Sequence, residues 1–239
     1  MNPTRSVVVE MVTVKSHEKF NGVYWVASDE GEKILATKNL APGIQVYGER
    51  LFKVKGDEYR AWNPYRSKLS AAIWNKINEI YLASGSKVLY LGTATGTTAS
   101  HVSDIIGNEG VLYGVDFAPR VMIQFKQNVA QHRRNIIPIF ADARKPREYA
   151  HIVGKVDLIY CDVAQPEQAK ILVDNALLTL KSGGHGMIAV KARSIDSVED
   201  PEVVYKREIR ILEENSFKIL EVVNLEPYEK DHVLVVAEY

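Results

Sequence analysis

The chain has 239 residues with 46% hydrophobic and 25% charged content, as expected of a globular protein with one large domain or one large and one small domain. Its 30 basic and 30 acidic residues give a formal net charge of zero, so any nucleic-acid-binding surface must be local or shared with other proteins. The single cysteine excludes an internal disulfide and favours the cytoplasm. No apolar run is long enough for a membrane span. The six scattered histidines show no metal-ligand spacing, so no metal is expected.

Residues 1–56 have the pattern of a small β-rich domain. Four stretches alternate with period two and predict short strands: "SVVVEMVTV", "GVYWVAS", "KILATKNL" and "QVYGERLFKV". Turn-rich pieces such as "SDEGE" and "APG" separate them. No acid–base cluster or metal-ligand spacing occurs in this region, so we expect a structural or partner-docking module rather than a catalytic one.

Residues 57–239 have the pattern of a second domain, in which strands and helices alternate. Apolar residues at helical spacing predict a helix from Lys68 to Leu82. Helical segments then follow each of five expected strands, "KVLYL", "GVLYGVD", "NIIPIFA", "VDLIYCD" and "GHGMIAVKA". This alternation predicts an α/β fold, a doubly wound Rossmann-like sheet of parallel strands covered by helices on both faces.

The end of the chain departs from this alternation. Two strands, "FKILEVVNL" and "HVLVVAEY", are separated only by "EPYEKD". A parallel crossover needs about a dozen residues or more, so the last strand should run antiparallel to the strand before it. A doubly wound sheet with an antiparallel last strand is the usual architecture of S-adenosylmethionine-dependent methyltransferases, a fold-level analogy.

The turn after "KVLYL" carries a glycine-rich sequence, "GTATGTT", that differs from a dinucleotide-binding loop. Gly92 fits the fingerprint Gly-x-Gly-x-x-Gly, but Ala94 and Thr97 stand where glycine is required. The departure argues against a nicotinamide-dependent oxidoreductase. The hydroxyls of Thr97 and Thr98 suit the amino-acid end of S-adenosylmethionine, which has no phosphate, and they fit equally well as caps of the following helix.

Carboxylates follow the next two strands. Asp116 ends "GVLYGVD", where an acid can accept hydrogen bonds from both hydroxyls of a ribose. Phe117 beside it can pack on adenine, and Asp142 after the third strand can receive the adenine amino group. Because parallel strands end at one edge of a sheet, this series favours an adenosyl ligand over the common occurrence of a lone aspartate after a strand.

Four further residues are expected at this edge: Lys68, Asp162, Lys191 and His232. Two lysines beside a carboxylate suit the removal of a proton from a ribose 2′-hydroxyl as it attacks a methyl sulfonium, because a desolvated lysine near another cation has a lowered pKa. Each residue alone also has an ordinary explanation. Lys68 fits a solvated cation, Lys191 a strand-end salt bridge and His232 a turn residue.

The residues now described resemble those of the fibrillarin family, in its shorter archaeal form, along essentially the whole chain. The matching motifs are "FNGVYWV", "LAPGIQVYGERL", "RAWNPYRSKLSAAI", "VLYLGTATGTTASHVSDIIG", "NIIPIFADARKPREY", "DVAQPEQA", "GGHGMIAVKARSID" and "EPYEKDHVLVV". The resemblance implies an S-adenosylmethionine-dependent RNA 2′-O-methyltransferase of box C/D guide ribonucleoproteins. It also implies three partners: a Nop-domain scaffold protein, a kink-turn-binding protein of ribosomal type, and a guide RNA with its target RNA.

The resemblance also implies roles by position. A cofactor-binding role falls on the turn and strand ends, at Gly92, Thr97, Thr98, Asp116, Phe117, Asp142, Ala143, Asp162, Val163, Ala164 and Gln165. Catalysis falls on Lys68, Asp162, Lys191 and His232. The sequence departs from the family at Asp116, where Glu is usual and whose shorter side chain can alter the ribose contact, and at Thr93 and Thr95. The alternative function is a non-enzymatic scaffold subunit of the same kind of particle.

Overall fold

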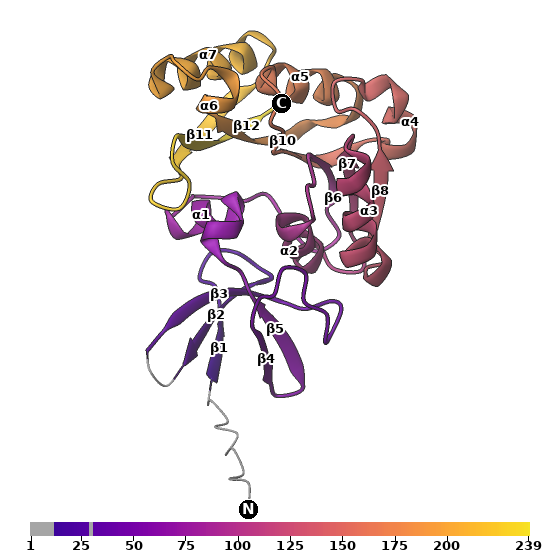
Figure 1. The fold of residues 1–239 in the computed structure, drawn as a ribbon, viewed down its shortest axis with the longest axis vertical. Helices are drawn as coiled ribbons and strands as arrows, with labels where there is room; N and C mark the ends of the chain where they lie inside the picture. The colour runs from indigo at the N-terminus through magenta and orange to yellow at the C-terminus, as the bar shows by residue number, and fades with distance from the viewer. Residues whose placement is uncertain (1–11, 29–30) are drawn as a thin grey trace, which may run out of the picture.

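The computed structural model describes residues 12–28 and 31–239, which form an N-terminal β-sheet beside a larger α/β body (Figure 1). The N-terminal sheet is antiparallel, with the strand order β1-β2-β3-β5-β4. Its strands are β1 (Val12–Ser16), β2 (Val23–Ser28), β3 (Lys33–Lys38), β4 (Leu51–Val54) and β5 (Asp57–Ala61). The part of the first expected strand that precedes Val12 lies outside the described residues.

The N-terminal sheet extends beyond the domain boundary expected at residue 56. Strand β5 starts at Asp57, pairs with β4 and β3, and ends at Ala61. Lys55 and Gly56 both have positive φ and form the tight turn between β4 and β5. The sequence change at residue 56 therefore marks a hairpin turn inside the sheet, and the sheet ends at Ala61.

The larger body is built on a seven-stranded sheet with the order β11-β12-β10-β9-β6-β7-β8. The strands from β10 to β8 are parallel, whereas β12 is antiparallel to both β10 and β11. The predicted doubly wound sheet with an antiparallel last strand is confirmed. Its strands are β6 (Lys87–Leu91), β7 (Val111–Asp116), β8 (Ile136–Phe140), β9 (Val156–Cys161), β10 (Leu180–Lys191), β11 (Lys218–Asn224) and β12 (His232–Glu238).

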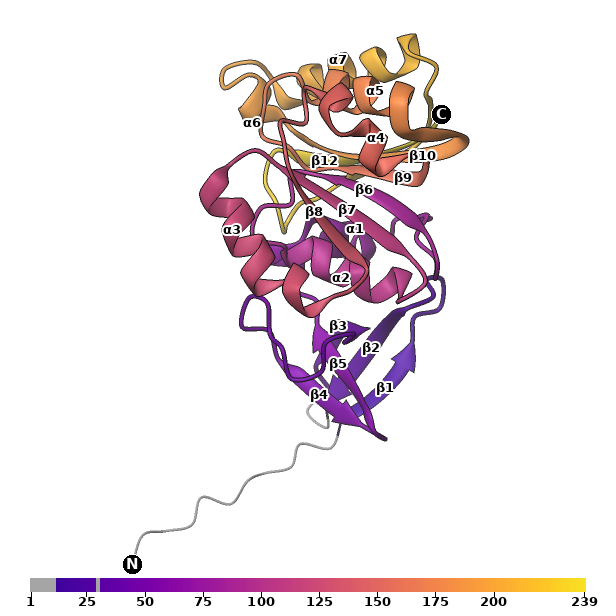
Figure 2. The same cartoon turned by 90° about the vertical axis from the view of Figure 1, so that its right-hand side faces the viewer.

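Helices cover both faces of this sheet (Figure 2). The α-helices are α1 (Lys68–Trp74), α2 (Thr97–Ile106), α3 (Pro119–Asn128), α4 (Ala150–Val153), α5 (Gln168–Thr179), α6 (Ala192–Ile195) and α7 (Pro201–Glu214). Short 3-10 helices are η1 (Pro64–Arg66), η2 (Ala130–His132) and η3 (Pro146–Glu148). None of the described helices is long and apolar enough to cross a membrane.

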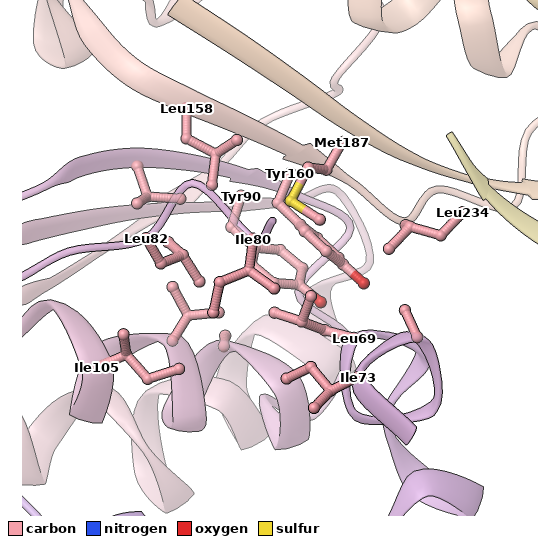
Figure 3. Packing of buried hydrophobic residues seen from close by; sticks show 14 of the residues in the cluster. Leu69, Ile73, Ile80, Leu82, Tyr90, Ile105, Leu158, Tyr160, Met187 and Leu234 are labelled. Atoms are coloured by element: carbon pink, nitrogen blue, oxygen red, sulfur yellow. The ribbon is translucent and has the colours of Figure 1, made fainter. Parts of the chain in front are cut away.

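Side chains alternate between the two faces along each strand, and so build two cores. Tyr90 and Tyr160 join the core beneath α1, α2 and α3, whereas Leu89 and Ile159 join the core beneath α4, α5 and α7. Figure 3 shows the first of these cores, where Leu69 and Ile73 of α1 lie near the two tyrosines and Ile105 of α2 belongs to the same cluster on the side of Leu82. Val23 and Leu35 of the N-terminal sheet belong to the same core, together with Phe20 of the β1–β2 turn.

The helix expected over Lys68–Leu82 ends at Trp74. The backbone N–H of Ile77 donates to Ala72 and that of Lys76 to Ile73, and Lys76 has φ +65°. This pair of hydrogen bonds is a Schellman motif, which closes a helix with a left-handed residue. Ile77 and Ile80 are nevertheless buried. They belong to an irregular segment that packs on the same core, and this is why the helical spacing of apolar residues continues past the end of α1.

A buried ionic network joins the N-terminal sheet to the larger body. The Asp104 carboxylate of α2 forms ion pairs with Arg60 of β5, at 3.2 Å, and with Arg133 after η2. It also accepts hydrogen bonds from the Thr37 hydroxyl at 2.7 Å and the Leu40 backbone N–H at 3.0 Å. The side chains of the three ionic residues are at most 1% exposed. Since buried charges are costly unless paired, this network fixes how the sheet sits on α2.

Candidate active site

The glycine turn holds the ends of three neighbouring strands together. Gly92 follows β6 with φ +81°, and its N–H donates to Val115 of β7 at 2.9 Å. A Cβ at this position would lie 2.8 Å from the backbone oxygen of Asp162, which follows β9. Glycine is needed here both for the left-handed backbone and for this close approach.

A cavity of about 320 Å³ opens at this edge of the sheet. Its wall contains eight of the residues expected to bind a cofactor: Gly92, Asp116, Phe117, Ala143, Asp162, Val163, Ala164 and Gln165. Three further lining residues are Ala94, Val115 and Lys191. Ala94 and Val115 were missed from the sequence because they offer no functional side chain.

Asp116 is held at the cavity wall by the backbone. One carboxylate oxygen accepts the Ala94 N–H at 3.1 Å, and the other accepts the Ala118 N–H at 3.0 Å. Carboxylate oxygens can each accept more than one hydrogen bond, so Asp116 keeps capacity for a ligand hydroxyl. Phe117 beside it is exposed and presents an aromatic ring to the same cavity.

Thr97, Thr98 and Asp142 are not among the cavity-lining residues. Thr98 is buried and donates from its hydroxyl to Ser67, at the start of α1, at 2.9 Å. The N-cap of α2 is Gly96, so neither threonine occupies that position. Asp142 pairs with Arg144 at 2.7 Å, and hydrogen bonds from that guanidinium outweigh desolvation to lower the pKa of Asp142. A role for these residues in cofactor binding stays a prediction.

Lys68, Asp162 and Lys191 form a compact charged cluster at one end of the cavity. The Asp162 Oδ1 lies 3.2 Å from the Lys68 Nζ and 2.8 Å from the Lys191 Nζ. The Lys191 ammonium also donates to the Asp162 backbone oxygen at 2.9 Å. The three side chains are only 13–16% exposed. Residues far apart in the sequence are thus brought together because α1 begins where β9 and β10 end.

Two lysines keep the central carboxylate ionised. Desolvation opposes ionisation of Asp162, but the charges and hydrogen bonds of Lys68 and Lys191 outweigh it, so the pKa of Asp162 is lowered. Both ammonium groups contact the Asp162 carboxylate directly, and a second carboxylate, that of Glu229, lies 4.0 Å from the Lys68 ammonium.

His232 lies beside the cluster without joining it. It opens β12 and stands opposite Lys191 in the antiparallel register. Its Nδ1 is 2.6 Å from the backbone oxygen of Lys230, so the ring is oriented by its own turn. Among the described residues, no hydrogen bond joins His232 to Asp162 or to either lysine. The antiparallel strand therefore brings His232 to the expected edge, and its role in catalysis stays a prediction.

Two supporting residues were missed from the sequence. The Glu229 carboxylate lies 4.0 Å from the Lys68 ammonium, and the Gln168 side-chain oxygen accepts the Lys191 backbone N–H at 3.0 Å. Glu229 occurs in the "EPYEKDH" motif, which was the available signal.

No group of three or more His, Cys, Asp or Glu side chains in residues 12–28 and 31–239 is arranged to hold a metal ion.

The fold and the site together define a class of protein. A parallel sheet with an antiparallel last strand, and a cavity at the carboxyl ends of β6, β7 and β9, is the arrangement of S-adenosylmethionine-dependent methyltransferases. The family model described as Fibrillarin matches residues 14–239. The chain belongs to the fibrillarin family.

Individual relatives match over nearly their full length. A fibrillarin-like rRNA/tRNA 2′-O-methyltransferase of Pyrococcus furiosus is 58% identical over 95% of this chain and 99% of its own. The structure of Aeropyrum pernix fibrillarin with natively bound S-adenosyl-L-methionine is 51% identical, with a TM-score of 0.90 over 95% and 99% of the two chains. A structure of a fibrillarin/Nop5p complex is 41% identical, with a TM-score of 0.82 over 93% and 99%.

Proposed function

We propose that this protein is an RNA ribose 2′-O-methyltransferase, acting on rRNA and tRNA as the catalytic subunit of a box C/D guide ribonucleoprotein. The observation that carries the proposal is that Asp162 and Lys191 belong both to the cavity wall and to the charged cluster. A methyl donor in the cavity is therefore adjacent to groups that can take the proton of an acceptor hydroxyl. The name of the Pyrococcus furiosus relative supports the RNA substrates.

The residues present in the cavity fit S-adenosylmethionine. Asp116 suits the two ribose hydroxyls, and the apolar surfaces of Phe117 and Ala143 suit the adenine. The turn at Gly92 has no side chain to narrow the cavity, and the polar Gln165 lies on the wall with Asp162. When bound, S-adenosylmethionine supplies an electrophilic methyl group on a positively charged sulfur.

The mechanism follows from the charged cluster. Lys68 or Lys191, in its neutral form, accepts the proton of the ribose 2′-hydroxyl, which makes the oxygen nucleophilic. Asp162 holds both lysine side chains within 3.2 Å of one carboxylate oxygen and so fixes where that proton is received. The small exposed fraction of these side chains limits competition from water.

The proposed particle contains further partners. The fibrillarin/Nop5p complex supports a Nop-domain scaffold protein as a direct partner of this chain. A kink-turn-binding protein, the box C/D guide RNA and the target RNA complete the proposal, and the net charge of zero supports RNA binding that is shared with these subunits. The matched relatives are proteins of archaea, which have no nucleus, and this supports a cytoplasmic particle.

The function is tested by methyl transfer in the assembled particle. The purified chain is combined with the scaffold protein, the kink-turn-binding protein and a guide RNA, and labelled S-adenosylmethionine is supplied with a matched target RNA. We expect label at the guided ribose and none with a target that already carries a 2′-O-methyl group there. Absence of both transfer and donor binding at millimolar S-adenosylmethionine would instead support a non-enzymatic scaffold subunit.

A substitution at Asp116 tests the proposed ribose contact. Because hydrogen bonds to a charged group contribute about 1.5–3 kcal/mol, we expect Asp116→Ala to raise the Kd for S-adenosylmethionine by about 10-fold or more. Titration calorimetry on the isolated chain measures this directly. Asp116→Glu should restore binding, and Asp57→Ala, in a surface ion pair of the N-terminal sheet, serves as the control. Wild-type affinity in Asp116→Ala would show that the carboxylate does not contact the donor.

A further inference from the structure

An aromatic pair of one exposed and one partly buried tyrosine lies beside the charged cluster and takes no part in the mechanism above. Tyr65 of η1 and Tyr228 of the β11–β12 loop pack edge to face, with ring centroids 5.1 Å apart and an angle of 74° between the rings. Tyr65 is 60% exposed, and its ring is therefore accessible to a ligand. In Figure 1 the β11–β12 loop reaches toward α1, which is where this contact is made.

Both tyrosines are tied to the catalytic edge through their neighbours in the chain. Tyr65 precedes Lys68 by three residues, and Ser67 ends η1 and caps α1 directly. Tyr228 precedes Glu229, whose carboxylate lies 4.0 Å from the Lys68 ammonium. Asn75 of the α1 C-cap donates two hydrogen bonds, at 2.7 and 2.8 Å, to the backbone oxygens of Asn224, the last residue of β11, and of Glu226 in the β11–β12 loop. The ring pair is thus held in a fixed place relative to Lys68.

The chemistry around the pair matches a single-stranded nucleic acid. Arg66 is exposed, lies over the Tyr47 ring at 5.8 Å, and forms no ion pair with any carboxylate of residues 12–28 and 31–239. Tyr65 and Arg66 also line a second cavity of about 520 Å³, which continues toward the N-terminal sheet past Tyr47 and Arg50. An aromatic face for a base, beside a free guanidinium for a phosphate, is how proteins bind unpaired nucleotides.

We propose that Tyr65, supported by Tyr228, stacks on a base of the target RNA within one nucleotide of the methylated ribose, and that Arg66 holds the adjoining phosphate. This inference rests on the proposed function. Tyr228 orients the ring before the RNA arrives, so little freedom is lost when the base stacks. Stacking at this position presents the 2′-hydroxyl to Lys68 and Lys191, which makes Tyr65 a positioning residue rather than a catalytic one.

The test compares Tyr65→Leu with Tyr65→Phe in the assembled particle. We expect Tyr65→Leu to raise the KM for target RNA about tenfold with little change in kcat, because base stacking on an aromatic ring is lost. Tyr65→Phe retains the ring and should retain the wild-type KM. The control is Tyr24→Leu, since Tyr24 and Tyr59 form a similar edge-to-face pair at 4.9 Å on the N-terminal sheet. Calorimetry with S-adenosylmethionine should give wild-type affinity for all variants, which shows that they are folded.

A binding readout separates this inference from the proposed function. Target RNAs carry 2-aminopurine at the methylated nucleotide or at either neighbour, and stacking quenches its fluorescence. We expect quenching at one of the three positions in wild type and Tyr65→Phe, and recovery of fluorescence in Tyr65→Leu. Quenching that depends on Tyr65 in a particle without methyl transfer would support the stacking site and contradict the enzymatic function.

Other results would overturn the stacking site. If Tyr65→Leu keeps both the wild-type KM and the wild-type fluorescence at all three positions, Tyr65 does not contact the RNA. If Tyr65→Leu weakens binding of the scaffold protein but leaves the KM of the saturated particle unchanged, the exposed ring is a protein-docking residue and the inference is wrong.

Discussion

The Lys191→Ala variant is expected to transfer methyl groups about 10²–10⁴-fold more slowly than the wild-type protein, the usual contribution of a positioned acid–base group. Lys191 donates both to the Asp162 carboxylate and to the Asp162 backbone oxygen, and it also lines the cavity. Its loss removes one of the two amines that can receive the hydroxyl proton, and it removes one of the two cations that pair with Asp162. Single-turnover assays of the particle at saturating donor and RNA measure the effect.

A second lysine on the same strand provides the matched control. Lys181 stands near the opposite end of β10, is half exposed, and pairs with Asp157 at the surface. Lys181→Ala should keep full activity. Full activity in Lys191→Ala would contradict the proposed role of that residue, and an equal loss in both variants would show that strand β10, rather than the amine, had been damaged.

The Asp104→Asn variant is expected to lower the free energy of unfolding by about 3–5 kcal/mol, the usual effect of removing one partner from a buried ion pair. The Asp104 carboxylate forms ion pairs with Arg60 and Arg133. It also accepts hydrogen bonds from the Thr37 hydroxyl and the Leu40 N–H. An amide of the same size leaves the buried Arg133 guanidinium without its ion-pair partner, and it leaves Arg60 paired only with the buried Glu49 carboxylate, at 2.7 Å. Urea unfolding followed by circular dichroism gives the free energy and shows whether the N-terminal sheet separates first.

A surface ion pair on α5 serves as the reference for this change. Asp174 pairs with Lys170 one turn earlier in the helix, where both side chains contact solvent. Asp174→Asn should cost only about 0.3–0.5 kcal/mol. A loss below 1 kcal/mol in Asp104→Asn would mean that the buried network orders the interface without stabilising it.

The order of strands and helices could be predicted because each element of the larger body has a strong local pattern. Apolar runs such as "KVLYL" and "VDLIYCD" become β6 and β9, buried on both faces. The six residues "EPYEKD" between the last two expected strands required an antiparallel pair, and β12 is antiparallel to β11. The end of α1 was not predictable, because Ile77 and Ile80 keep helical spacing while packing from an irregular segment.

The position of the site could also be predicted, because residues at the carboxyl ends of parallel strands meet at one edge. Asp116, Asp162 and Lys191 were placed there by this rule, and all three line the cavity. This strand-end rule does not predict details that depend on tertiary contacts. Thr98 turns away to bond Ser67, and Asp142 pairs with Arg144, its near neighbour. The ionic network of Arg60, Asp104 and Arg133 joins residues whose sequence spacing carries no signal.

The place of β12 in the sheet has a practical consequence for labelling this protein. Although β12 comes last in the chain, it lies between β10 and β11 and runs against both. Its first residue, His232, therefore lies at the reactive edge, and Tyr239 lies at the opposite edge, held there by hydrogen bonds with Gly183 and Gly184. A fluorescent protein or affinity tag fused after Tyr239 would emerge on the side opposite the charged cluster of Lys68, Asp162 and Lys191, with its attachment point anchored beside an interior strand of the sheet.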